Sequence, residues 1–330
     1  MLSFVKKFRD KRFFAALSYD ISQVLQGGSV TMLDVGAAGG VLPRWEGLKK
    51  NISFIGVEPD RRSYEDLMNA PETKEFRYYE IIQKGAWSSD TTIQINFTKK
   101  PLCSTYFTPN VSFLSLFPNS ERFDVMHTFE IDCSPVDNFV SSKSKEIDFV
   151  KLDLEGGELE IIDGAQQLLQ GCVALHVEVG FQYMRLGQPL FGDVAKRICD
   201  FDFEFIDFIT ICRWERDRYT NLGQAIFGDA LFMKSPETMI KSINKNVDEN
   251  LGKLRSYLAV LIIYDRHDLA LRFLDLLSVS AVIDKSYIDQ IQKIIIRRRK
   301  KLDKRHKFLT RANSFASLFS SPFVEGHLIY

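Results

Sequence analysis

The stretch that decides the fold is Thr31-Met-Leu-Asp-Val-Gly-Ala-Ala-Gly-Gly-Val41. An apolar run of β-forming residues ends in Asp34, and small residues follow at once. Gly36 permits a backbone conformation that other residues avoid, and Gly39 and Gly40 add no side-chain bulk. The pattern predicts a strand, a tight turn and a helix N-terminus, where backbone N–H groups can approach a polar ligand.

The spacing within this turn separates two kinds of nucleotide site. The dinucleotide pattern Gly-x-Gly-x-x-Gly is broken, because Ala38 and Val41 stand at its second and third glycine positions. Asp34, Gly36 and Gly40 instead form Asp-x-Gly-x-x-x-Gly, which resembles the first motif of class I S-adenosylmethionine (SAM) methyltransferases. The alternative is an ordinary glycine-rich turn of a doubly wound sheet.

Composition narrows the class of protein. The chain has 330 residues, enough for two domains, and its equal numbers of basic and acidic residues (43 each) give no general electrostatic reason to bind nucleic acid. The 27 phenylalanines predict thick cores and an apolar cleft. Five scattered cysteines without a Cys-x-x-Cys pair, a charged N-terminus and no membrane-length apolar run favour a cytoplasmic protein.

The next two strands are expected to supply the nucleoside part of the site. The second ends in Glu58-Pro59-Asp60, about 20 residues beyond the glycine turn, where a carboxylate can accept both hydroxyls of a ribose. A third strand over 76–83 is followed by Ala86 and Trp87, which are candidate neighbours of an adenine. The alternatives are a surface acid for Glu58 and a plain core residue for Trp87.

A second informative block is Ile147–Ala165, in which a buried strand delivers Asp153 and Glu155 at its carboxyl end. The strand after it carries His176 and Glu178, which share one face because strand side chains alternate. These four side chains together are what general-base or metal chemistry would use. His176 by itself is as consistent with a hydrogen-bonded core residue.

The remaining elements complete an α/β pattern. We expect a leading amphipathic helix over 3–26, which either closes over the cofactor or packs on the sheet edge, and a helix over 42–50. Alternation over 91–97 predicts half of a hairpin in a β-rich insertion that shapes an acceptor pocket. Strands over 201–209 and 230–234 would close the sheet as an antiparallel pair, so the sheet is mostly parallel with an antiparallel last strand.

In their order along the chain, these motifs resemble the FkbM family of SAM-dependent methyltransferases, over roughly residues 30–235. Asp34–Gly40 is similar to the family's glycine motif, and Val150–Glu160 to its strongest signature, lKiDvEGaE. Pro101–Thr105 with Pro109-Asn110 resembles its CSS…PN loop, and Ser134–Phe139 its tLDd segment. Ala38 and Pro135-Val136 depart from the family pattern, so the resemblance does not identify the acceptor substrate.

The resemblance implies a Rossmann-like class I methyltransferase sheet, SAM as cofactor and O-methylation of a hydroxyl on a sugar, glycan or natural product. The expected cofactor-binding residues are Asp34, Gly36, Ala37, Gly40, Glu58, Pro59, Ala86, Trp87 and Asp153. The expected catalytic residues are His176, Asp153 and Glu155, with His176 or Asp153 as the base. A divalent metal at Asp153, Glu155, His176 and Glu178 is left open, because no ligand spacing demands it.

The chain changes character after Ser235-Pro236. Glycine becomes scarce and about four long helical patterns follow, so we expect a methyltransferase domain over 1–236 and an all-α domain over 237–330. The helical domain is expected to form a homo-oligomer or to cover the acceptor site. Its basic run Arg297–Lys307 is expected to be a solvated helix end; the alternative is contact with a membrane surface or an anionic carrier.

Two other functions remain open at this stage. A nicotinamide-dependent oxidoreductase would use a similar sheet, although the broken dinucleotide pattern argues against it. The other possible function is that of a binding protein, in which the sheet is a non-catalytic scaffold and the helical C-terminus binds a partner.

Overall fold

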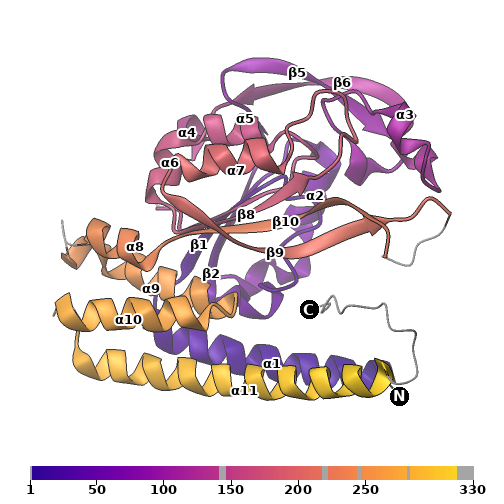
Figure 1. Cartoon of the computed structure of the whole chain (residues 1–330). Coiled ribbons are helices and arrows are strands. Elements are labelled where there is room, and N and C mark those ends of the chain that lie inside the picture. The colour runs from indigo at the N-terminus through magenta and orange to yellow at the C-terminus, as the bar shows by residue number, and fades with distance from the viewer. Residues whose placement is uncertain (1, 141–145, 218–221, 244–246, 281–282, 318–330) are drawn as a thin grey trace.

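The centre of the computed structural model is a seven-stranded sheet in the order β3-β2-β1-β7-β8-β10-β9 (Figure 1). The structure describes residues 2–140, 146–217, 222–243, 247–280 and 283–317. The strands of this sheet are β1 (Val30–Val35), β2 (Ile52–Val57), β3 (Tyr78–Ile82), β7 (Phe149–Leu152), β8 (Ala174–Gly180), β9 (Phe203–Trp214) and β10 (Gln224–Lys234).

The register confirms the mostly parallel sheet with an antiparallel last strand. Strand β1 pairs in parallel with β2 on one side and with β7 on the other, and β7 pairs in parallel with β8. The last strand, β10, is antiparallel to both β8 and β9 and lies between them, so β9 forms the edge. All six residues of β1 are buried, as expected for a central strand covered on both faces.

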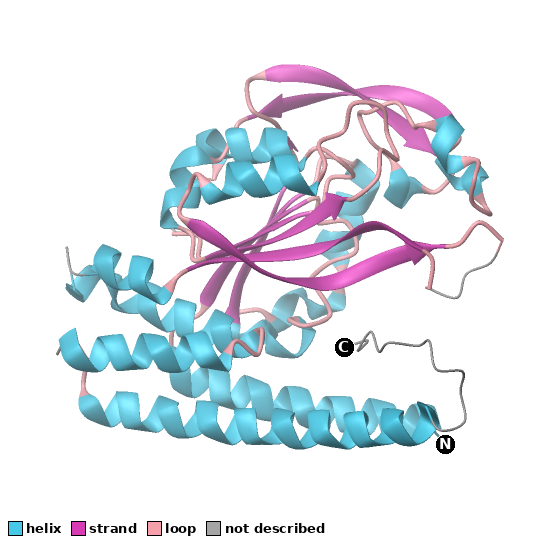
Figure 2. Cartoon of the chain, viewed as in Figure 1, coloured by secondary structure: helices cyan, strands magenta, loops and turns pink. Residues whose placement is uncertain are grey.

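Helices cover both faces of the sheet (Figure 2). One face packs against helices of the central part of the chain, and its core includes Leu33, Val150, Ile161 and Ile198. These helices are α4 (Val136–Phe139), α5 (Glu158–Asp163), α6 (Gln166–Gly171) and α7 (Phe191–Cys199). The connections contain two short helices, α2 (Arg61–Asn69) and α3 (Val111–Leu114). They also contain four described turns of 3-10 helix, η1 (Glu46–Asn51), η2 (Pro71–Glu75), η3 (Pro101–Cys103) and η4 (Ser120–Phe123).

The other face is covered by the two ends of the chain together. The four C-terminal helices that the pattern predicts are present: α8 (Pro236–Ile243), α9 (Val247–Ile263), α10 (His267–Ser280) and α11 (Lys285–Ser317). The leading helix α1 (Leu2–Leu25) contacts α9 and α11 and runs beside α11 in Figure 1. It packs on η1, and its described side chains do not line the cavity described below.

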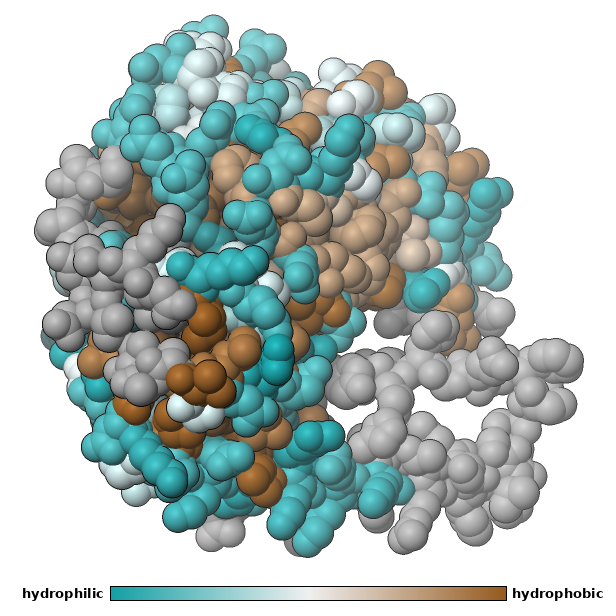
Figure 3. All heavy atoms as spheres, turned by 60° about the vertical axis from the view of Figure 1, so that its left-hand side comes forward, coloured by the Kyte–Doolittle hydropathy of each residue, from teal (hydrophilic) through white to brown (hydrophobic). Residues whose placement is uncertain are grey.

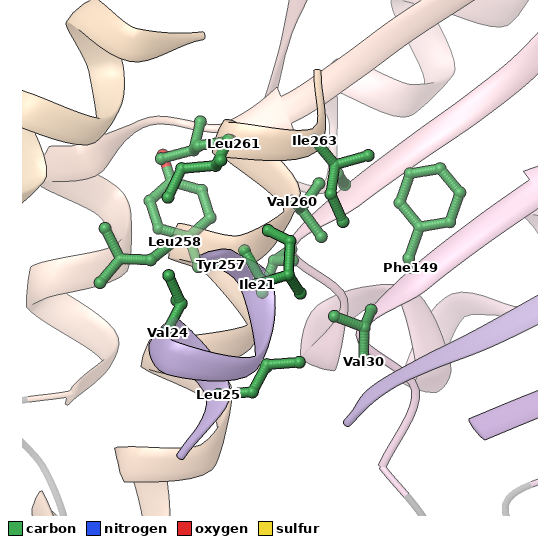
Figure 4. Close-up of a cluster of buried hydrophobic side chains, with 14 of the residues drawn as sticks. Ile21, Val24, Leu25, Val30, Phe149, Tyr257, Leu258, Val260, Leu261 and Ile263 are labelled. Atoms are coloured by element: carbon green, nitrogen blue, oxygen red, sulfur yellow. The ribbon is translucent and has the colours of Figure 1, made fainter. Parts of the chain in front are cut away.

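One hydrophobic core joins these C-terminal helices to the sheet. Val30 and Phe149 of the sheet pack with Ile21 of α1 and with Leu258 and Leu261 of α9 (Figure 4). Polar contacts tie the same layers: the Tyr257 hydroxyl donates to the backbone oxygen of Lys234 at 2.7 Å. The change of sequence character at 236/237 therefore marks the start of a new layer, and the core itself is shared.

A second, three-stranded sheet, β4-β6-β5, stands beside the carboxyl ends of the main strands. Its strands are β4 (Gly85–Ala86), β5 (Thr91–Thr98) and β6 (Val125–Ser134). The expected hairpin is confirmed, because β5 and β6 pair antiparallel from Thr91↔Cys133 to Thr98↔Val125. This sheet is the β-rich insertion that the sequence predicts.

The phenylalanine-rich packing expected from composition is found around the edge strand. Phe208 of β9 has its ring centroid 4.9 Å from that of Phe191 on α7 and 4.8 Å from that of Phe205. Phe205 is still 40% exposed. On the face presented in Figure 3, hydrophobic residues gather in a broad area bordered by hydrophilic ones.

Two local expectations need correction. No α-helix forms over 42–50, where the structure has only the 3-10 turn η1, since Pro43 and Gly47 interrupt the segment. Strands β9 and β10 are longer than predicted, since β9 continues to Trp214 and β10 begins at Gln224.

Within the described ranges, no helix is both long and apolar enough to cross a membrane.

Candidate functional site

A cavity of about 420 Å³ lies where the carboxyl ends of β1, β2, β7 and β8 meet the β5–β6 hairpin. Eight of the residues predicted for the site line this cavity, namely Gly36, Glu58, Pro59, Ala86, Trp87, Asp153, Glu155 and Glu178. Four others lie outside its lining, namely Asp34, Ala37, Gly40 and His176. The structure thus brings together most of the predicted nucleoside and acceptor residues, and each of the four exceptions has a physical reason.

Glu58, at the end of β2, is the best-oriented carboxylate in the cavity. Its Oε2 accepts the backbone N–H of Ala38 at 3.1 Å, and its Oε1 accepts that of Asp60 at 2.8 Å. Each oxygen keeps a second lone pair, so the group can still accept two hydroxyls of a ribose. Burial raises the pKa of Glu58, and the two backbone hydrogen bonds oppose that shift.

N–H groups within the glycine turn bond to the protein backbone, whereas the sequence predicts that they face a ligand. The N–H groups of Gly36 and Ala37 donate to the backbone oxygen of Val57 at 3.0 and 3.2 Å, and that of Gly40 donates to Ala37. No helix begins at the turn, because Gly39 and Gly40 adopt positive φ angles of 90° and 80°. The expected cradle of backbone N–H groups at a helix N-terminus is therefore wrong for these residues; the turn orients Glu58 and lines the cavity with Gly36.

Gly36 is required by a close approach of two backbones. It has φ of +80°, and a Cβ built on it would lie 2.2 Å from the backbone oxygen of Asp153. Only glycine fits both the conformation and the space. This contact places the ends of β1 and β7 side by side and thereby positions Asp153 in the cavity.

Asp34 does not reach the cavity. It is fully buried beneath the turn, with the Nζ of Lys151 3.1 Å from its Oδ1. Burial raises the pKa of Asp34 to about 7, against the opposing influence of Lys151. Asp34, which the sequence predicts to bind the cofactor, is thus held beneath the turn in an ion pair with Lys151.

Lys151 is a residue that the sequence analysis missed. Its Nζ lies 3.1 Å from Asp34 and 3.4 Å from Asp153 Oδ2, and it donates to the backbone oxygen of Gly36 at 3.3 Å. Burial disfavours the ammonium form, but Asp34 and Asp153 outweigh it and raise the pKa of Lys151. The one available signal was a lysine within an otherwise apolar buried strand, since such a charge needs partners.

His176 lies on the same strand as Glu178 but faces the C-terminal helices. Its Nδ1 is 3.1 Å from the hydroxyl oxygen of Tyr264, and its Nε2 is 3.3 Å from Asp229 Oδ1. Tyr264 is itself fully buried and accepts a hydrogen bond from the indole N–H of Trp45 at 3.2 Å. The geometry gives His176 the role of a hydrogen-bonded core residue, so we withdraw it as the candidate base.

Glu155 lines the cavity but already has a cationic partner. The buried guanidinium of Arg185 donates to its Oε2, and the hydroxyl of Thr105 donates to its backbone oxygen at 2.8 Å. Glu155 also adopts φ of +55°, an uncommon conformation for a residue other than glycine. Among the described residues, no three His, Cys, Asp or Glu side chains converge to hold a metal ion, so Asp153, Glu155, His176 and Glu178 do not form a ligand set.

Besides Glu58, the carboxylates of Asp153 and Glu178 line the inner part of the cavity without a buried arginine. Burial, together with Asp153, Glu158 and Asp229 nearby, raises the pKa of Glu178 well above its usual range. A carboxylate whose pKa is raised binds a proton more strongly than an ordinary glutamate does. The sequence analysis placed Glu178 in a cluster suited to general-base or metal chemistry but chose His176 or Asp153 as the base, because the pKa of a strand residue depends on neighbours that the sequence does not reveal.

Comparison with solved structures finds class I methyltransferase chains at low similarity. Magnesium protoporphyrin IX methyltransferase from Synechocystis PCC 6803 with bound SAM is 10% identical, with a TM-score of 0.33 over 70% of this chain and 83% of that one. A TehB-like SAM-dependent methyltransferase from Corynebacterium glutamicum is 13% identical, with a TM-score of 0.30 over 71% and 97%. The N-methyltransferase NodS from Bradyrhizobium japonicum is 9% identical, with a TM-score of 0.34 over 69% and 96%.

The family comparison is more specific. A search of curated proteins gives no match. The family model described as the methyltransferase FkbM domain, in contrast, matches residues 34–205, just over half of the chain. The match begins at Asp34 and extends through the whole cavity lining to the start of β9, which favours methyl transfer over the nicotinamide alternative. The chain belongs to the FkbM family of SAM-dependent methyltransferases.

Proposed function

We propose that this protein transfers the methyl group of SAM to a hydroxyl of a sugar, glycan or natural-product acceptor. The observation that supports this most strongly is that Glu58, Asp153 and Glu178 line one cavity although they come from three different strands. A ribose-binding carboxylate and an acceptor-side carboxylate pair then lie within reach of one bound nucleoside.

The residues present fit SAM at the strand ends. Glu58 would hold the ribose hydroxyls, and the half-buried Trp87, next to the buried Ala86, offers an apolar edge for the adenine. Trp87 is held in place by an edge-to-face contact with Tyr106, whose ring centroid is 4.5 Å away. When bound there, SAM supplies an activated methyl group, so the protein mainly has to position the acceptor.

Asp153 and Glu178 have different roles in this proposal. The Nζ of Lys151 lies 3.4 Å from Asp153, and Asp153 would orient the acceptor by accepting a hydrogen bond from a second polar group next to the reacting hydroxyl. Glu178, whose pKa is raised by burial and by nearby acids, would take the hydroxyl proton as the new C–O bond forms. Glu155, which is paired with Arg185, would shape the rim of the cavity.

The direct experiment is transfer of radiolabelled methyl from SAM to cell-extract fractions separated into saccharide, lipid and small-molecule pools. We expect label that resists mild alkali, as a methyl ether does. Label released by alkali would indicate methyl esters formed on carboxylates, and label found on amines would indicate N-methylation. Either result would overturn the proposal that a hydroxyl is methylated.

The assigned roles are tested by two variants assayed alongside the wild type. Glu178→Gln should lower kcat by roughly a hundredfold or more while the affinity for S-adenosylhomocysteine (SAH) stays unchanged, because only proton removal is affected. His176→Asn should lower thermal stability but leave kcat within a few-fold. A large loss of kcat in His176→Asn with unchanged stability would return the base role to His176.

A further inference from the structure

The wall of the cavity opposite the strand ends is an apolar ladder built by the β5–β6 hairpin. The ladder consists of Ile93, Ile95, Phe97, Phe129 and Ile131, all of which line the cavity. Cross-strand pairing places Ile93 opposite Ile131 and Ile95 opposite Phe129, so the two strands form one continuous apolar surface. Along β5, the four residue steps of this surface span about 13 Å.

The two faces of the hairpin differ in chemistry. The residues that alternate with the ladder, such as Gln94, Glu130 and Asp132, are polar and exposed on the opposite face. The ladder residues themselves are only half-buried, and they line the cavity, so part of their apolar surface is open toward it. Leu102, which also lines the cavity, is 62% exposed at its mouth. Apolar surface left open in this way indicates a ligand with an apolar part.

The charges in the cavity argue against an anionic ligand. Its lining includes five carboxylate residues, Glu58, Asp60, Asp153, Glu155 and Glu178, but only two cationic ones, Arg62 and Lys84. Arg62 already has protein partners. Its Nη2 lies 3.1 Å from Asp60 Oδ2, and its Cζ lies 5.0 Å from the centroid of the Phe97 ring. Asp153 and Glu155 are balanced by Lys151 and Arg185, which leaves Glu58 and Glu178 against Lys84. The cavity therefore offers a phosphate or diphosphate no excess of positive charge.

We propose that the acceptor is an uncharged amphiphile whose hydroxyl-bearing end meets Asp153 and Glu178 and whose apolar chain or ring system lies along the ladder. The proposal rests on the proposed function for the position of the reacting hydroxyl. It goes further by selecting, among sugars and natural products, those that carry an extended apolar portion. Free sugars and sugar nucleotides are excluded as good acceptors, because the former leave the ladder uncovered and the latter bring phosphate charge.

The proposal is tested by calorimetric binding to the SAH-loaded full-length protein. The probes are butyl, hexyl and octyl β-D-glucosides below their micellar concentrations, with glucose and a uridine-diphosphate sugar for comparison. Each pair of added methylenes should tighten binding roughly tenfold, as for apolar surface that becomes buried. Glucose and the sugar nucleotide should bind at least a hundredfold more weakly than the octyl glucoside. Equal binding of glucose and octyl glucoside would overturn the proposal.

Matched variants locate the effect on the ladder. Ile95→Gln and, separately, Ile131→Thr should weaken octyl glucoside at least tenfold, whereas Gln94→Ala on the opposite face should leave it unchanged. The affinity for SAH serves as the check on folding and should be retained in all three variants. If Ile95→Gln weakens SAH as strongly as the glucoside, the ladder covers the cofactor and the acceptor proposal is wrong.

These binding measurements do not depend on catalysis. A chain-length effect accompanied by label on amines would support the ladder as the acceptor site and refute only O-methylation. Alkali-stable label on small polar acceptors, without any effect of chain length on binding, would refute only the role of the ladder as the acceptor site.

Discussion

At the scale of single residues, the site depends on one glycine and one buried lysine that together position its carboxylates. Gly36 allows the end of β1 to contact the backbone of Asp153, and Lys151 holds Asp34 and Asp153 from below. The carboxylates in the cavity are thus fixed by a buried cation and by backbone contacts. A change at either kind of residue is expected to affect binding and stability together.

Replacing Gly36 by alanine should be far more damaging than the same change at Gly39. Both glycines have positive φ, of +80° and +90°, but only the Gly36 Cβ would collide with a backbone atom, whereas nothing lies within 4 Å of a Cβ at Gly39. Gly39→Ala should cost about 1 kcal/mol of conformational strain. Gly36→Ala should cost at least about 2 kcal/mol more and abolish SAH binding, as measured by urea unfolding and calorimetry. Equal effects of the two substitutions would show that the close approach is unimportant.

Replacing Glu58 by glutamine should weaken SAH binding by roughly tenfold to a hundredfold, because a neutral amide accepts ribose hydroxyls less strongly than a carboxylate. The matched control is Glu65→Gln, since Glu65 lies on the exposed face of nearby α2 and pairs with Arg61. Calorimetric titration with SAH measures both. Unchanged affinity in Glu58→Gln would remove Glu58 from the cofactor site.

At the scale of elements, motif residues outside the cavity fix how helices and loops sit. Asp137 accepts the backbone N–H groups of Gln167 and Leu168 at 2.8 and 2.9 Å and so caps α6 from a distant part of the chain. Asn110 caps α3 by accepting from Phe113 and ties its loop to Tyr183. Within the segments that resemble the family's loop motifs, Asp137 and Asn110 are therefore structural supports of α6 and of the insertion, whereas Pro101, Leu102, Ser104 and Thr105 line the cavity.

Replacing Asp137 by alanine tests this structural interpretation. The first N–H groups of α6 would lose their acceptor, which should cost about 1 to 2 kcal/mol of stability. SAH affinity should stay within about twofold, because Asp137 does not line the cavity. Thermal unfolding and calorimetry provide the two measurements. Lost SAH affinity without lost stability would contradict a capping role.

At the scale of the whole molecule, the two ends of the chain complete one face of the sheet. Met32, Phe54 and Leu231 of the sheet share a core with Leu258 and Phe273 of the C-terminal helices. The basic run also contributes to this assembly, since Arg297 and Arg298 pair with Asp20 of α1. Arg299, Lys300, Lys301, Lys304 and Lys307 are exposed, as expected for a solvated helix end. Contact of this run with a membrane or an anionic carrier remains a prediction, as does oligomer formation through these helices.

A chain ending at residue 236 should not fold into a stable domain. Removal of α8–α11 would expose the apolar face of the sheet that α9 covers, at a cost of about 25 cal/mol for each Å² of apolar surface returned to water. We expect aggregation or a loss of cooperative unfolding in calorimetry, with the full-length chain as control. A soluble monomer over 1–236 that unfolds cooperatively would show that the two parts are independent domains.

The pH dependence of stability follows from the buried acids. Burial raises the pKa of Asp34 and that of Glu158 to about 7, so both hold a proton in the folded chain at a pH where the unfolded chain has lost it. Stability of the ligand-free protein should therefore fall as pH rises from about 4.5 to about 7 and level off above, with a limiting slope of about 1.4 kcal/mol per pH unit for one such group.

Glu158→Gln isolates one of these acids. The amide oxygen can still accept from the backbone N–H groups of Leu154 and Gly156, which Glu158 Oε1 accepts at 2.8 and 3.3 Å. The variant should show a shallower fall of stability with pH by urea unfolding. A steeper fall, or stability that rises over this interval, would contradict the raised pKa of Glu158.

The sequence by itself determined the sheet, its glycine turn, the carboxylate at the end of β2, the acidic block after β7 and the four C-terminal helices. These features depend on local periodicity and on the rule that parallel strands present their carboxyl ends at one edge. Only the tertiary structure decided three contacts: the buried ion pair of Asp34 with Lys151, the hydrogen bond of His176 with Tyr264 in the core, and the ion pair of Arg185 with Glu155. The partners in these contacts are between 30 and 117 residues apart, and burial sets their protonation, so no local pattern encodes them.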